Sequence, residues 1–294
     1  MIKRFVLCLA TTALMTAQAL GAHARAPATA PAAPATPAPA VAAPSAPVAS
    51  NTIQLVWEVY ITGLKIGMVG LKTDFAPGGY SSASMLKTGG LIGLFDSSRI
   101  TATSVGAIAG ATLRPRNSDA DANSRKRQKT QLAYTANGVQ LFADPAYDTE
   151  RFPVTEEQKR DTLDPVSAMT FAVSGLSVNA DHPCGDTLHV FDGARRYDVA
   201  FRFIGNETLA GGRDGYSGPA VKCEVLYQQI AGFKPSVNQG KKSYPIYVWG
   251  AAFATQQGSG PMHRFVVPVK IQTETSFGTA EADASLVKID DQKR

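Results

Sequence analysis

Residues 54–61 read Gln-Leu-Val-Trp-Glu-Val-Tyr-Ile, and this stretch decides the fold. Apolar Leu55, Trp57, Val59 and Ile61 alternate with mostly polar neighbours. A period of two places successive side chains on opposite faces of a strand. The stretch therefore predicts a β-strand with one packed face and one face toward solvent.

The same alternation recurs further along the chain, in residues 69–75, 197–203, 221–227, 247–253 and 280–286. Turn-forming residues separate such runs: Pro77-Gly78-Gly79, Asn137-Gly138, Asp192-Gly193 and Gly211-Gly212. We therefore expect a mostly all-β fold, a single antiparallel meander of roughly a dozen strands that forms a curved open barrel or half-barrel. Pro268 interrupts a strand pattern and predicts an edge or a bulge, because proline cannot donate to the ladder.

One or two short helices are expected near residues 155–175. Residues 155–158, Thr-Glu-Glu-Gln, form a capping box, and Asp164-Pro165 offers a second helix start. The second helix, running from Pro165 to about Val173, is mostly apolar and should be buried. It is either an ordinary packing helix or a plug in the open sheet.

The N-terminus has the three parts of a secretory signal peptide. Lys3 and Arg4 precede an apolar stretch over residues 5–20, and Ala22-His23-Ala24 offers a cleavage site. A second site after Ala19 is an alternative. The stretch is short for a membrane-spanning helix, so we expect cleavage, export to the periplasm and no transmembrane segment afterwards.

The expected domains are a signal peptide over residues 1–24, a linker over residues 25–50 and a β-rich envelope domain over residues 51–294. The linker is almost only Ala and Pro, with seven prolines, and cannot form a core, so we expect it to be disordered. Cleavage after Ala24 removes two of the 29 basic residues and lowers the net charge from +5 to +3. That mild charge, together with export, excludes a nucleic-acid binder.

Cys184 and Cys223 are the two cysteines that remain after cleavage. An even number of cysteines in an oxidising compartment predicts a disulfide between them. A redox pair or a metal site would need a Cys-x-x-Cys motif or further ligands, and the sequence offers neither.

The sequence favours a protein without catalytic residues, metal or cofactor. Only His182, His189 and His263 remain after cleavage, without the spacing of metal ligands. A Gly-x-Ser-x-Gly elbow and a phosphate-binding glycine loop are both missing from the sequence.

Three segments are candidate contact sites, each with a structural alternative. The glycine-rich segment 89–95 carries Leu91, Ile92, Leu94 and Phe95. It is either a lip that touches a ligand or partner, or a buried loop.

The second segment contains Arg125, Lys126, Arg127 and Lys129. It either faces an anionic surface such as lipid headgroups or is a solvated strand that discourages edge pairing.

In the third segment, Asp192, Arg195 and Arg196 flank a turn. They either clamp an anionic ligand or fix a hairpin.

Several motifs occur in one order along the chain: residues 63–67 (Gly-Leu-Lys-Ile-Gly), 88–95, 113–116, 164–168, 190–197 (Val-Phe-Asp-Gly-Ala-Arg-Arg-Tyr) and 218–223. In these motifs the chain resembles the bacterial envelope family known as domain of unknown function 3108, over most of residues 52–288. The resemblance implies export and a β-rich domain, and it supplies no catalytic residues. The expected architecture is also similar, more loosely, to the half-barrel carriers that ferry lipoproteins across the periplasm.

The expected function is a non-catalytic periplasmic protein that supports envelope integrity or assembly through contacts with envelope proteins or other components. The alternative is a periplasmic carrier that binds a lipid or other hydrophobic ligand in the concave sheet. The small inward residues Ala280, Ala282 and Ala284 would leave room for such a ligand, although they would equally let helix and sheet pack closely.

Overall fold

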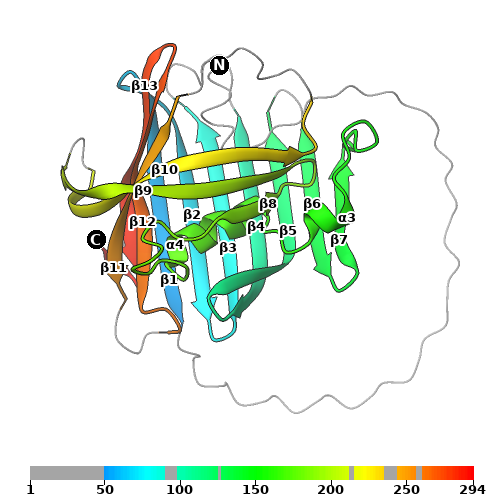
Figure 1. Cartoon of the computed structure of the whole chain (residues 1–294), viewed down its shortest axis with the longest axis horizontal. Coiled ribbons are helices and arrows are strands. Elements are labelled where there is room, and N and C mark those ends of the chain that lie inside the picture. The colour runs from blue at the N-terminus through cyan, green and yellow to red at the C-terminus, as the bar shows by residue number, and fades with distance from the viewer. Residues whose placement is uncertain (1–49, 90–97, 125–126, 212–214, 235–243, 256–259) are drawn as a thin grey trace, which may run out of the picture.

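The computed structural model describes residues 50–89, 98–124, 127–211, 215–234, 244–255 and 260–294 (Figure 1). In this part of the chain, one antiparallel sheet of 14 strands runs in the order β7-β6-β5-β4-β3-β2-β1-β13-β12-β11-β10-β9-β8, with β14 paired to β13. The first and last long strands, β1 and β13, are neighbours inside the sheet. Two meanders therefore join along the β1–β13 ladder, and β7 and β8 are the edges of an open sheet.

The first meander contains β1 (Asn51–Ile61), β2 (Leu64–Ala76), β3 (Gly79–Thr88), β4 (Arg99–Ala109), β5 (Thr112–Asn123), β6 (Gln128–Thr135) and β7 (Gly138–Asp144). The second contains β8 (Leu188–Phe191), β9 (Arg196–Ala210), β10 (Ser217–Ala231), β11 (Ile246–Ala254), β12 (Arg264–Thr275), β13 (Gly278–Ile289) and β14 (Gln292–Lys293). The expected mostly-β, open and curved meander is confirmed.

Two helices, α3 (Glu156–Lys159) and α4 (Pro165–Ser174), connect the meanders. Both begin where the sequence predicts, with the capping box at Thr155 and with Asp164 as the N-cap of α4. In Figure 1, β9 and β10 cross in front of strands of the first meander, and α4 lies on the same side of the sheet. Helix α4 contacts β3, β4, β5, β8 and β12, so it fills the concave side.

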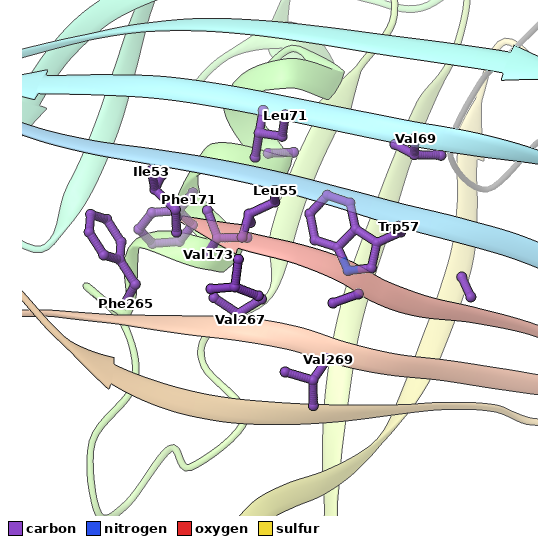
Figure 2. Packing of buried hydrophobic residues seen from close by; sticks show 14 of the residues in the cluster. Ile53, Leu55, Trp57, Val69, Leu71, Phe171, Val173, Phe265, Val267 and Val269 are labelled. Carbon is purple, nitrogen blue, oxygen red and sulfur yellow. The ribbon is translucent and has the colours of Figure 1, made fainter. Parts of the chain in front are cut away.

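The core lies between α4 and the inner side of the sheet. Figure 2 shows Phe171 and Val173 of α4 among strand side chains that include Leu55, Phe265 and Val267. All five side chains are buried, and among the elements that α4 contacts β12 has the most extensive contact. Apolar burial of this kind is the largest favourable contribution to the free energy of folding.

The segment between the helices links the two sheet edges. Leu163 forms a parallel bridge with Val190 of β8, donating its N–H to His189 at 2.8 Å and accepting from Phe191 at 2.9 Å. Phe191 in turn packs against Leu132 and other residues of β6 and β7. The edges are therefore joined by an inserted segment and by side chains, while the sheet itself stays open.

Bulges adjust two strands of the core. The β11–β12 register shifts between Trp249 and Gly250, opposite Pro268, so the predicted bulge is confirmed, although β12 is an internal strand. The indole N–H of Trp57 donates to the Pro268 carbonyl at 2.5 Å. A second shift, between Val56 and Trp57, leaves no residue of β1 directly opposite Ser285 of β13, although the Ser285 hydroxyl donates to the Val56 carbonyl at 3.3 Å.

This second bulge corrects the expected face of β13. The alternation over residues 280–286 predicts that Leu286 points inward, as Ala280, Ala282 and Ala284 do. Instead, Leu286 is only half-buried, while Val287 and Ile289 are buried. The extra residue Ser285 shifts the alternation by one position, which moves the next side chain to the other face.

Candidate functional site

A buried polar cluster surrounds the N-terminus of α4. The Asp164 side chain has no solvent exposure and accepts the backbone N–H groups of Val166 and Ser167 on Oδ1, at 3.0 and 3.1 Å. Its Oδ2 accepts the hydroxyls of Ser104 and Ser167, at 2.7 and 2.5 Å. One carboxyl group therefore caps the helix and ties it to β4.

Hydroxyl groups extend this cluster to β3. Tyr80 and Ser167 share a hydrogen bond of 2.6 Å between their hydroxyls, and Ser104 lies 2.8 Å from the Ser167 hydroxyl. One turn further along α4, the Thr170 hydroxyl donates to Ser82 at 2.8 Å. Helix α4 thus makes directional contacts to the sheet as well as apolar ones.

Burial also sets the ionisation of the cluster. Loss of solvent raises the pKa of Asp164 above its ordinary value of 3.8, and hydrogen bonds from Ser167 and Ser104 offset part of that rise. Burial raises the pKa of Tyr80 to about 12 and the pKa of Tyr134 well above its usual range. Both tyrosines are therefore neutral at physiological pH, and burial favours the protonated form of Asp164.

The cluster contains residue types that take part in acid–base chemistry, but a substrate cannot reach them from solvent. Asp164 and Ser167 are both 0% exposed, and Tyr80 is 4% exposed. A reacting group must meet its substrate within hydrogen-bond reach. The arrangement supports a structural role, in which the cluster fixes α4 inside the curved sheet.

The predicted disulfide between Cys184 and Cys223 is present. It joins the loop after α4 to β10, with an S–S distance of 1.98 Å, and closes a span of 39 residues. Cys223 is 4% exposed, as expected for the packed side of its strand. The bond stabilises the link between the helix region and the second meander.

Asp192, Arg195 and Arg196 contact different neighbours at the β8–β9 turn. Asp192 Oδ1 accepts the backbone N–H groups of Ala194 and Arg195, at 2.9 and 2.7 Å. The Arg195 guanidinium lies 5.6 Å from the centre of the Phe233 ring, and Arg196 donates to Asp198 at 2.5 Å. These contacts agree with the hairpin-fixing alternative, and the anion clamp stays a prediction.

Of the basic segment 125–129, the structure describes only residues 127–129. Arg127 forms an ion pair of 3.0 Å with Asp121, and exposed Lys129 lies opposite Asp144 in the ladder. Arg125 and Lys126 lie outside the described residues, as do the apolar positions Leu91, Ile92, Leu94 and Phe95.

The described ranges offer neither a metal-binding group nor a membrane-spanning helix. They contain no group of three or more His, Cys, Asp or Glu side chains that could hold a metal ion. Across the same ranges, neither helix has the length and apolar character needed to cross a membrane.

Sequence reasoning identified Asp164 as a cap but missed the hydroxyl cluster around it. One available signal is the small hydroxyl residue at an inward position of successive strands, namely Ser82, Ser104, Ser118 and Thr130, all of which are buried. Such residues in an otherwise apolar inner face indicate a polar group on the opposite side.

The family described as "Protein of unknown function (DUF3108)" matches residues 56–285 of the chain. The chain belongs to this family. The match spans nearly the whole sheet of this DUF3108 protein, from β1 into β13, and confirms the resemblance seen in the sequence motifs.

A solved structure resembles this DUF3108 chain in architecture. It is the crystal structure of a β-barrel-like protein of domain of unknown function DUF1849 from Brucella abortus, with 10% sequence identity and a TM-score of 0.49. The similarity covers 82% of this chain and 98% of that chain. No curated protein matches the sequence.

Proposed function

We propose that this DUF3108 protein is an exported, non-catalytic periplasmic protein that supports bacterial envelope integrity or assembly through surface contacts. The observation that carries the export part is the Cys184–Cys223 disulfide. Structural disulfides form and persist in oxidising compartments and are rare in the cytosol. The signal-peptide pattern over residues 1–24 supports the same location.

Burial of the polar cluster supports the non-catalytic part of the proposal. The hydroxyl and carboxyl groups that could react are enclosed between α4 and the sheet and bond to one another. They hold the fold together, which leaves the outer surface as the part available to partners.

Packing of the concave side favours surface contacts over the carrier alternative. Ala280, Ala282 and Ala284 are 0%, 2% and 6% exposed and belong to the same core cluster as Trp57 and Phe171. Their small size thus agrees with close packing of neighbouring core side chains. A hydrophobic ligand in this place would have to displace side chains of that core cluster.

Deletion of the gene tests the envelope role. We expect the deletion strain to be more sensitive to detergent, and the full-length chain to restore resistance. A chain without residues 1–24 should fail to restore it, because it stays in the cytoplasm. Unchanged sensitivity after deletion, or rescue by the leaderless chain, would contradict the proposal.

A further inference from the structure

Two turns at one end of the sheet expose large apolar side chains side by side. Leu64 follows the β1–β2 turn and Phe277 lies in the β12–β13 turn, and each is 58% exposed. The backbone N–H of Thr62 in the first turn donates to Thr279 beside the second turn at 2.8 Å. These hairpin ends lie at the top of Figure 1.

A pair of unneutralised cations lies near the same end. Lys87 of β3 and Arg99 of β4 are directly opposite each other in the ladder, and both are exposed. Like charges in opposed positions repel each other. Within the described part of the chain, neither side chain forms an ion pair, whereas nearby Lys65 is neutralised by Glu58.

The two features are close enough to act on one surface. Lys87 lies opposite Met68, four residues along β2 from Leu64, which corresponds to about 13 Å at the rise of a strand. The backbone N–H of Gly89, at the end of β3, also donates to Ile66 at 2.9 Å. The long basic side chains can therefore lie at headgroup level when the apolar tips enter the acyl boundary, which lies about 5–10 Å deep.

We propose that Leu64, Phe277, Lys87 and Arg99, termed the turn-end surface, dock onto an anionic phospholipid bilayer. The exposed apolar tips match the interface between headgroups and acyl chains, and the cation pair matches the negative headgroup charge. The proposal rests on export, since the periplasm brings the protein next to membranes. Residues 90–97 and 125–126 lie outside the described residues, and the turn-end surface is defined without them.

Sedimentation with vesicles tests the proposal. Purified, disulfide-bonded protein should bind phosphatidylglycerol vesicles and bind phosphatidylcholine vesicles at least about ten-fold more weakly. Binding to phosphatidylglycerol should also weaken as salt is added, because exposed charges are screened.

Variants assign the binding to the proposed residues. Lys87→Glu with Arg99→Glu should weaken binding to phosphatidylglycerol by at least about ten-fold, since each basic residue contributes about a factor of five near such a surface. Leu64→Ser with Phe277→Ser should weaken it by a similar factor.

Matched controls come from exposed residues elsewhere. Phe142→Ser replaces a phenylalanine of nearly the same exposure, 56%, on the edge strand β7. Lys72→Glu with Arg114→Glu reverses two exposed charges away from the proposed surface. Both controls should bind within two-fold of the natural protein, a margin of about 0.4 kcal/mol.

Equal binding to both lipids, no binding to either, or unchanged binding by the Lys87 and Arg99 variant would each overturn the proposal. Export is measured by cell fractionation, so a failed vesicle experiment would leave the proposed location standing.

Discussion

Replacing both Cys184 and Cys223 with alanine should lower the free energy of unfolding by about 4 kcal/mol, the value expected for a closed loop of 39 residues. The disulfide reduces the conformational entropy of the unfolded chain, and in the folded protein it holds the loop after α4 against β10. Urea unfolding without reductant, followed by tryptophan fluorescence, measures the change.

Reductant provides the control for the cysteine variant. It should lower the unfolding midpoint of the natural protein toward that of the variant and leave the variant unchanged. If the variant and the oxidised natural protein unfold at the same urea concentration, the disulfide does not stabilise the fold.

Asp164→Ala should cost about 3 kcal/mol of stability at neutral pH. The change removes the cap of α4, worth about 1 kcal/mol, and leaves the hydroxyls of Ser104 and Ser167 without their buried acceptor. Asp164→Asn should cost less, because asparagine caps helices well and retains one oxygen for the backbone N–H groups. Equal losses in the two variants would contradict the assigned role of the cap.

The difference in stability between the natural protein and Asp164→Asn should depend on pH, and its sign follows from the pKa of Asp164. The pKa of Asp164 is raised above 3.8 in the folded state, so the folded protein holds this proton more tightly than the unfolded chain. The stability that comes from this tighter proton binding is fully present below pH 3.8 and is lost as the pH rises through the raised pKa of Asp164. Natural protein should therefore lose stability relative to Asp164→Asn over that interval, measured by urea unfolding at a series of pH values.

Local features of this fold could be predicted because they depend on neighbouring residues. Period-two alternation located β1, β2, β9, β10, β11 and β13, and the turns at Gly78, Gly138 and Gly193 lie where expected. It did not locate β3, β4 and β5. Capping residues placed the starts of both helices. The disulfide followed from compartment and cysteine number, without any knowledge of which strands pair.

Features that depend on pairing between distant strands could not be predicted. The neighbours β1 and β13 join the two ends of the domain, and nothing local in either strand specifies that ladder. The bulge at Ser285 requires the register of this pairing, which explains the error at Leu286. The cluster at Asp164 likewise needs side chains from β3, β4 and α4 to meet.

The turn-end surface likewise could not be predicted from the sequence. Leu64 and Phe277 are more than 200 residues apart in the sequence, and nothing in their local sequence indicates that they lie close together. Only the paired hairpins show that both lie exposed at one end of the sheet, near Lys87 and Arg99. The basic run at residues 125–129, in contrast, is visible in the sequence because four of its five residues are basic.

We propose that this protein works outside the cytoplasm as an oxidised, exported domain. The decisive measurement is cell fractionation combined with alkylation of free thiols before and after reduction. We expect a periplasmic protein that begins at Arg25, or at Leu20 if the alternative site is used, with Cys184 and Cys223 reactive only after reduction. A cytoplasmic protein that retains residues 1–24 and has both thiols free would contradict it.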